Sequence, residues 1–164
     1  NHLNSAQFTG IYYNSGDEFP LLIISRCGNT SSLSEYDECL VFRITRNGTT
    51  FSAELVNSIS HNFRTYGASW AIDSNAMTIT IACYTEGSYL VTTNNPLKFI
   101  TWRLPKKSDI LSGNSITLNI EDCIAQYETE HRTFQGMCAC GGKIYAGIID
   151  AGYTESLWVV DVSG

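Results

Sequence analysis

The feature that most limits the fold of this chain is a run of short apolar segments, separated by turn residues, that recurs along the sequence. From residue 8 onward these segments come in sets of four, and a second set follows the first at a spacing of about sixty residues. Short apolar or alternating segments bounded by turn residues are typical of β-strands. Because repeat units bury their apolar faces against neighbouring units, the pattern predicts an array of similar sheets.

Two landmarks within the sets give the boundaries of the repeat. The first is a histidine followed by an aromatic residue, a glycine and a strand-like run; its three copies contain every histidine of the protein, and their glycines are Gly10, Gly67 and Gly136. The second is a charged residue between two apolar residues in the third segment of each set, namely Arg43, Arg103 and Asp161. The two landmarks agree, and they predict units over about residues 8–60, 66–129 and 134–164, the last one incomplete.

Four antiparallel strands in each unit are typical of a β-propeller blade. We therefore predict an all-β fold, a partial β-propeller of about three four-stranded antiparallel blades, with residues 1–164 in one β-repeat domain. A β-sandwich also consists of many short strands at regular spacing and is the alternative. Propellers use about 4–8 blades, so we expect this domain to be a fragment of a larger propeller. The remainder of its own chain, or a second copy, would then cover the open sheet faces and edges.

Several segments resemble uncharacterised β-propeller repeat proteins of bacterial cell surfaces. The resemblance rests on EFPLLIIS, CLVFRI and LVNSI in the first unit, LKFITWRLP in the second, and QGMCACGGKIYAG with LWVVDV in the third. It implies a cell-surface, periplasmic or extracellular location, although this segment carries no recognisable signal.

Composition excludes several classes of protein. With 43% hydrophobic and 16% charged residues, the chain is too apolar to be disordered. Its formal charge of -6 and its scattered basic residues argue against nucleic acid as a partner. No apolar run approaches the roughly 20 residues that a transmembrane helix needs.

The expected function is a non-enzymatic binding or scaffold module, with a glycan or a protein segment as ligand at one propeller face and without a cofactor. In a propeller, the links into the innermost strands lie on the same rim as the loops between second and third strands. Aromatic side chains on such a rim suit sugar or peptide contacts. The candidate ligand-binding residues are therefore His61, His131, Tyr36, Tyr89 and Tyr153.

The alternative function is part of a hydrolase or lyase that acts on polysaccharide, with its site in the propeller channel. Such a site needs a carboxylate or histidine on an innermost strand, and only Asp73 among the residues expected there would serve as an acid or base. The other carboxylates fall in loops or at strand ends, where solvated charge is the default interpretation.

Neither the histidines nor the cysteines predict a metal site. Equivalent positions on adjacent sheets are about 10 Å apart, whereas metal–ligand bonds are about 2 Å long. Cys27 ends one strand and Cys39 begins the next, so a disulfide between them is geometrically sensible. The remaining cysteines, Cys83, Cys123, Cys138 and Cys140, are interpreted as core residues.

Overall fold

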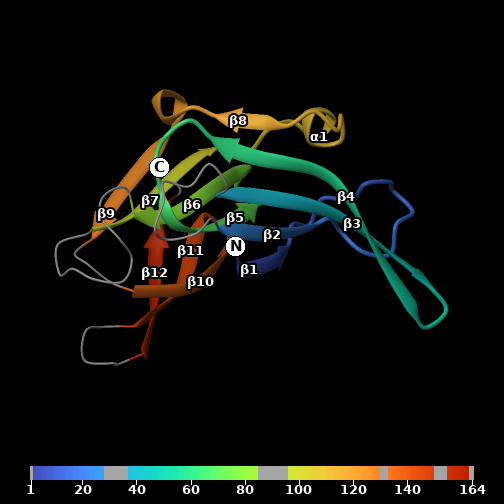
Figure 1. The fold of residues 1–164 in the computed structure, drawn as a ribbon, viewed down its shortest axis with the longest axis horizontal. Coiled ribbons are helices and arrows are strands. Elements are labelled where there is room, and N and C mark those ends of the chain that lie inside the picture. The colour runs from blue at the N-terminus through green and yellow to red at the C-terminus, as the bar shows by residue number, and fades with distance from the viewer. Residues whose placement is uncertain (1, 28–36, 85–95, 130–132, 150–154, 163–164) are drawn as a thin grey trace.

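The structure, a computed structural model, describes residues 2–27, 37–84, 96–129, 133–149 and 155–162. They form an all-β arrangement of three sheets that is not closed (Figure 1). Sheet A contains, in spatial order, β1 (His2–Phe8), β2 (Leu22–Cys27), β3 (Glu38–Asn47), β4 (Thr50–His61) and β8 (Ile116–Leu118). Sheet B contains β5 (Tyr66–Asp73), β6 (Thr78–Tyr84), β7 (Leu97–Arg103) and β9 (Ala125–Thr129). Sheet C contains β10 (Thr133–Cys140), β11 (Lys143–Ile149) and β12 (Glu155–Asp161).

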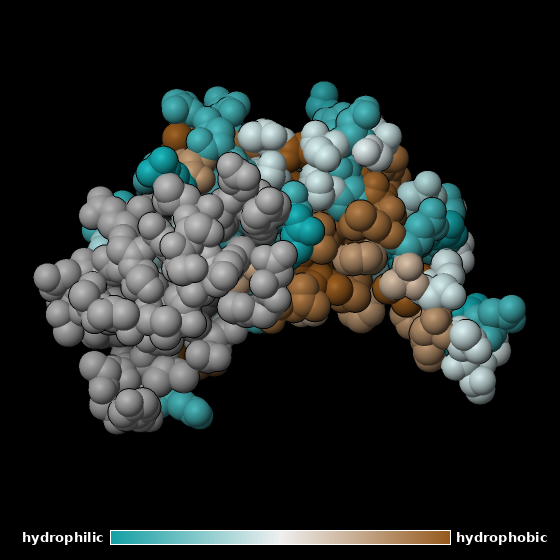
Figure 2. All heavy atoms as spheres, viewed as in Figure 1, coloured by the Kyte–Doolittle hydropathy of each residue, from teal (hydrophilic) through white to brown (hydrophobic). Residues whose placement is uncertain are grey.

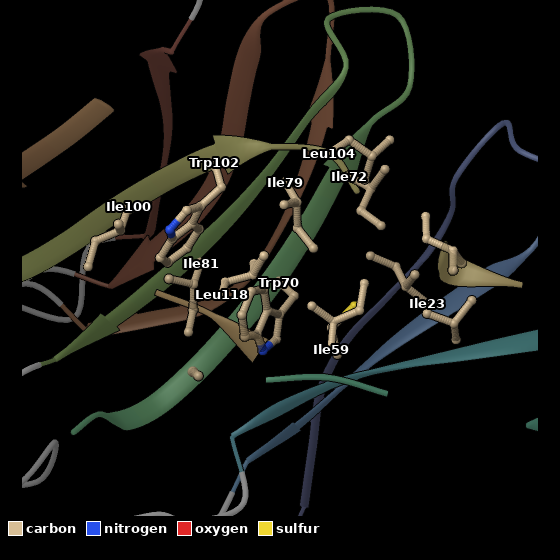
Figure 3. Packing of buried hydrophobic residues seen from close by; sticks show 14 of the residues in the cluster. Ile23, Ile59, Trp70, Ile72, Ile79, Ile81, Ile100, Trp102, Leu104 and Leu118 are labelled. Carbon is tan, nitrogen blue, oxygen red and sulfur yellow. The ribbon is translucent and has the colours of Figure 1, made fainter. Parts of the chain in front are cut away.

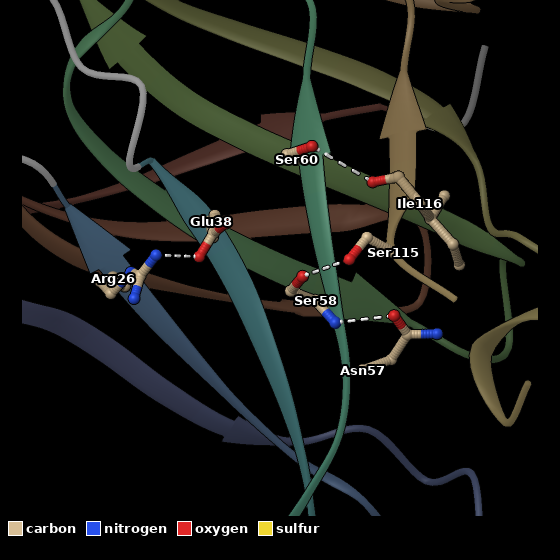
Figure 4. Close-up of polar contacts among 7 residues, drawn as sticks. All are labelled: Arg26, Glu38, Asn57, Ser58, Ser60, Ser115 and Ile116. Atoms are coloured by element: carbon tan, nitrogen blue, oxygen red, sulfur yellow. Dashed lines mark hydrogen bonds and ion pairs between the residues drawn. The ribbon is translucent and has the colours of Figure 1, made fainter. Parts of the chain in front are cut away.

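All neighbouring strands are antiparallel except β8, which pairs in parallel with β4. Serine side chains reinforce that added pairing (Figure 4). The Ser58 hydroxyl lies 3.3 Å from that of Ser115, and the Ser60 hydroxyl donates to the carbonyl of Ile116 at 3.3 Å. Two short helical turns, α1 (Lys107–Ile110) and η1 (Ile120–Asp122), flank β8. No helix in the described parts of the chain has the length and apolar character to cross a membrane.

Sheet B is the middle layer, and its strands β5, β6 and β7 are buried on both faces. Alternate residues of β5, β6 and β7 face sheet A, among them Trp70, Ile81 and Trp102 (Figure 3). The intervening residues, such as Ala82 and Phe99, pack against sheet C. Strands buried on both faces have near-continuous apolar sequences, and every residue of β6 is buried.

The first strands of the three sheets, β1, β5 and β10, lie side by side at the centre. The Gln7 amide group donates to the carbonyl of Ile72 at 2.9 Å and to that of Ala139 at 3.1 Å. A Cβ atom at Gly136 would lie 3.2 Å from the carbonyl oxygen of Asn4, so the glycine permits β10 to approach β1 closely. Polar side chains of β1 therefore join all three sheets.

The sequence pattern places the first strand from residue 8 onward, and this is wrong, because the first strand of sheet A comes earlier, at His2–Phe8. Its polar side chains hydrogen-bond to backbone groups of neighbouring strands. Because these residues are polar, the strand lacks the apolar pattern by which strands are recognised in sequence. Gly10, with φ of +77°, follows this strand, whereas Gly67 and Gly136 lie within β5 and β10. The glycine landmark is therefore not equivalent in all three units. Arg43, Arg103 and Asp161 do lie in the third strands, β3, β7 and β12.

The end of the expected unit 66–129 is divided between two sheets over residues 115–128. Its first part is β8 in sheet A, and its last part is β9 in sheet B. Between them, the carbonyl of Asn119 accepts a hydrogen bond of 2.7 Å from the indole of the buried Trp102. This contact holds the turn against the core where the chain changes sheets.

The loop that precedes β2 is anchored by ion pairs, which corrects the interpretation of Asp17 as a solvated charge, whereas Glu18 is exposed to solvent. Arg43 donates two hydrogen bonds to Asp17, at 2.9 and 2.7 Å, and Arg46 pairs with Glu18 at 2.5 Å. The hydrogen bond from Arg43 lowers the pKa of Asp17 below its usual value. The two arginines thus hold the loop against β3.

The outer face of sheet A is apolar and uncovered within the described residues. Phe8, Leu22, Phe42 and Leu55 are in register across β1 to β4, and Phe8 and Leu55 are 50% and 57% exposed. Figure 2 shows an apolar area over the part of the molecule that Figure 1 draws as β2 and β3. Contiguous exposed apolar surface of this kind is typical of an interaction surface.

Candidate functional site

Of the five predicted ligand-binding residues, the structure describes His61. It is the last residue of β4, at the link into β5, where the sequence pattern places it. His131, Tyr36, Tyr89 and Tyr153 lie outside the described residues, so their part in a ligand site stays a prediction.

His61 belongs to a buried chain of hydrogen bonds with Thr65 and Asp37. The Thr65 hydroxyl donates to the carboxylate of Asp37, and His61 Nε2 lies 3.2 Å from the same hydroxyl. Since that hydroxyl has one proton and gives it to Asp37, we assign the proton between His61 and Thr65 to Nε2. Nδ1 then carries a lone pair, and it has no hydrogen-bond partner within the described parts of the chain.

Aromatic rings enclose the other side of His61. Its ring centroid is 4.2 Å from that of Phe63 and 5.9 Å from that of Trp70. Burial lowers the pKa of His61 below its usual value, although the charge of Asp37 and the backbone of Phe63 oppose the shift. The folded protein therefore favours the neutral imidazole.

This environment predicts a pH dependence of stability. The pKa of His61 is lowered in the folded state from an ordinary value of 6.5, so the unfolded chain binds a proton more readily there. The stability that the neutral ring contributes is present above pH 6.5 and is lost as the pH falls through 6.5 toward the lowered value. The free energy of unfolding would be measured in urea at about pH 7.5 and about pH 5. Between these two pH values it should fall less for His61→Phe than for wild type, because the variant has no ring to protonate. Equal losses in both proteins would contradict the assignment.

A groove of about 410 Å³ lies beside this link. Phe63 and Arg64 form one wall, and the other lining residues are Lys98, Ile100, Ile120 and Gln126. The Phe63 ring is held between His61 and Trp102, whose ring centroid is 6.1 Å away. Arg64 is exposed and makes no hydrogen bond or ion pair with the described residues, whereas Lys98 pairs with Glu128 at 3.2 Å. The groove offers a half-buried aromatic ring beside an available guanidinium group.

Asp73, the candidate acid or base of the enzymatic alternative, has a structural role. It is 3% exposed, and its carboxylate accepts hydrogen bonds from the backbone N–H groups of Asn75 and Ala76, both at 3.0 Å, and of Gly142 at 2.7 Å. The first two contacts form the turn between β5 and β6, and the third joins it to the turn between β10 and β11. A carboxylate occupied by three backbone donors is poorly suited to proton transfer.

The cysteines occupy three kinds of environment: Cys27, Cys39 and Cys83 are buried, Cys123 is half-buried, and Cys138 and Cys140 are exposed. Cys27 and Cys39 are buried, but the register places Ser25 rather than Cys27 opposite Cys39, so their disulfide stays a prediction. Burial raises the pKa of Cys39 far above its usual value. Cys138 and Cys140 do share one face of β10, but that face is exposed, because the alternating Met137 and Ala139 fill the core. Their assignment to the core is wrong.

Sequence reasoning missed Asp37 and Thr65, the partners of His61. Asp37 was taken as a solvated loop charge, yet it is 3% exposed. Thr65 lies four residues after His61, and no sequence motif marks it as a hydrogen-bond partner. The proximity of Asp37 to both follows from the antiparallel return of β3 and β4, which brings the start of β3 next to the end of β4.

Within the described residues, no three His, Cys, Asp or Glu side chains gather where they would hold a metal ion. Comparisons with protein-family models, with curated proteins and with solved structures found no match. The fold and site together define an all-β protein of three packed sheets, with a buried Asp–Thr–His chain behind a surface groove.

Proposed function

We propose that the three sheets are successive blades of a partial β-propeller, and that the chain is a non-enzymatic binding module. The order of strands supports the propeller: in each sheet the first strand is the edge strand that lies at the centre of the molecule, and the following strands run outward in sequence. The packing of sheet B between sheets A and C is compatible both with consecutive propeller blades and with the layers of a sandwich. The polar contacts of β1 with both β5 and β10 favour blades that converge on one axis.

The ligand site is the groove beside the link of residues 62–65, and its ligand is a glycan or a protein segment. The observation that carries this proposal is the position of Phe63 and Arg64: an aromatic ring supported from behind by His61 and Trp102, next to a guanidinium group that has no described partner. Aromatic faces stack on sugars and on peptide side chains, and arginine binds their acidic groups.

The proposal predicts that Arg64→Gln weakens ligand binding. Arg64 is exposed, so this change should leave the fold intact. The isotope-labelled protein would be titrated with a short oligosaccharide of neutral hexoses, an oligosaccharide of uronic acids and a short acidic peptide, and followed by amide chemical shifts. We expect one of these probes to shift the amides of residues 62–65, 98 and 126, and Arg64→Gln to weaken its binding by about tenfold.

Arg46→Gln is the matched control, since it removes the same charge from the distant β3–β4 hairpin. It should bind the probe as wild type does. If no probe shifts the amides around the groove, or if the two variants weaken binding equally, the groove is not the ligand site.

The apolar outer face of sheet A supports a second role, as a scaffold that contacts another protein surface. Phe8 stacks near Phe19, with ring centroids 6.4 Å apart, and Phe19 lies 5.9 Å from Phe51, so the face extends onto the β3–β4 hairpin. Another part of the same chain, or a second copy, would bury these rings.

A further inference from the structure

A second hollow, of about 620 Å³, lies between sheets B and C at the other end of β5 from the groove. The β5–β6 turn, with Asn75, Ala76 and Met77, forms one side, and the β10–β11 turn, with Gly141 and Gly142, forms another. The remaining lining residues are Thr78, Arg103, Ile124, Ala125 and Val162. No carboxylate is among the described lining residues.

The walls of this hollow are fixed by hydrogen bonds between segments far apart in sequence. Asp73 joins the two turns, as described above. In addition, the Leu104 N–H donates to the carbonyl of Met77 at 2.8 Å, and the Val162 N–H donates to that of Gly142 at 2.9 Å. The hollow is therefore formed before any ligand binds. Little of the binding free energy is then spent on ordering its walls.

Met77 gives the β5–β6 turn an unusual backbone. Its φ is +55°, a left-handed conformation that costs a side-chain-bearing residue about 1–2 kcal/mol. Its side chain is 54% exposed and lines the hollow. A folded protein retains such a residue only where the surrounding structure imposes it, and these places are often ligand sites.

Two polar side chains in the hollow have no described partner. Thr78 is 6% exposed, and its hydroxyl is buried without a hydrogen bond. Arg103 lies directly opposite Thr78 in the β6–β7 register; it is exposed and makes no ion pair or hydrogen bond with the described residues. A buried hydroxyl without a hydrogen-bond partner is energetically unfavourable. The guanidinium group gives the hollow a local positive charge, although the protein as a whole carries a net charge of -6.

The chemistry of the lining limits the ligand. The planar fork of arginine matches a carboxylate with two hydrogen bonds, and the residue opposite Arg103 is Thr78, whose buried hydroxyl lacks a described partner. Met77, Ile124 and Val162 surround these groups with aliphatic surface. No aromatic ring, on which a sugar would stack, is among the described lining residues.

We propose that this hollow binds the C-terminal carboxylate of a peptide whose last side chain is aliphatic. The carboxylate pairs with Arg103 and accepts from Thr78, while the aliphatic side chain contacts Met77, Ile124 and Val162. This site is separate from the groove at the opposite end of β5, and it does not depend on the function proposed there.

The test compares a short fluorescent peptide that ends in leucine with the same peptide bearing a C-terminal amide. Fluorescence polarisation should show that wild type binds the free acid at least about tenfold more tightly than the amide. Arg103→Gln should weaken binding of the acid by about tenfold or more and remove the preference for it. Thr78→Val, which preserves the shape of the side chain, should weaken binding by several-fold and leave the unfolding transition in urea unchanged or shifted to higher urea.

Arg46→Gln again removes one arginine far from the hollow, and it should bind the acid as wild type does. Equal binding of acid and amide, or an Arg103→Gln variant that binds as wild type, would overturn the proposal. It would also be overturned if a uronic-acid oligosaccharide bound in an Arg103-dependent way and the peptide did not.

Discussion

Trp70→Ala should lower the free energy of unfolding by about 3–5 kcal/mol, the range found when large aromatic residues are removed from protein cores. Trp70 has no exposed surface and fills the space between sheets A and B, where its ring centroid lies 6.3 Å from that of Trp102. The variant loses the buried apolar area and leaves a cavity that the two sheets cannot close, since Ile81 and Ile59 are fixed on either side by their strands. Urea unfolding followed by far-UV circular dichroism measures the change.

Leu157→Ala is the control for this prediction, because it removes a large aliphatic side chain that is 68% exposed in the described structure. Its effect should stay within about 0.5 kcal/mol. A loss below about 1 kcal/mol for Trp70→Ala would show that sheets A and B do not pack through this residue.

The second large effect is expected at Asp73. Asp73→Ala removes the acceptor of three backbone N–H groups, one of them on the β10–β11 turn, and should lower the free energy of unfolding by about 3 kcal/mol. Asp73→Asn retains one acceptor oxygen and should lose less. Because Gly142 is 69 residues from Asp73, the amide of Gly142 should also exchange with solvent faster in both variants.

Glu155→Ala removes an exposed carboxylate at the start of β12 and serves as the control. It should change stability by no more than about 0.5 kcal/mol and leave exchange at Gly142 unaltered. If Asp73→Ala unfolds as wild type does, the carboxylate does not join the two turns.

The sequence pattern predicted the strands whose alternate residues are apolar and misplaced those that are polar. The apolar segments EFPLLIIS, CLVFRI and LKFITWRLP overlap the observed strands β2, β3 and β7. The first strand, β1, was missed, because Asn4, Ser5 and Gln7 are polar. Each of them bonds to a neighbouring strand: Asn4 to Ala68, Ser5 to Ser69 and Gln7 to Ile72. Local sequence contains no information about partners that lie more than sixty residues away.

The same limit applies to the sites. The link position of His61 follows from the repeat pattern, but its connection to Asp37 through Thr65 depends on how β3 and β4 return. The closeness of Thr78 and Arg103 depends on the β6–β7 register. Neither hollow has a sequence signature, since each is formed by residues from three or more separate segments.

The contacts of Gln7 also have a consequence for the order of folding. Its side chain bonds to the carbonyl of Ala139, a residue 132 positions later in the chain. The centre of the molecule is therefore incomplete until the last of the three sheets has formed, whatever stability the first two gain earlier. Structures dominated by such long-range pairings fold in about milliseconds to seconds. During synthesis, this one hydrogen bond of the first strand cannot form until nearly the whole described chain has left the ribosome.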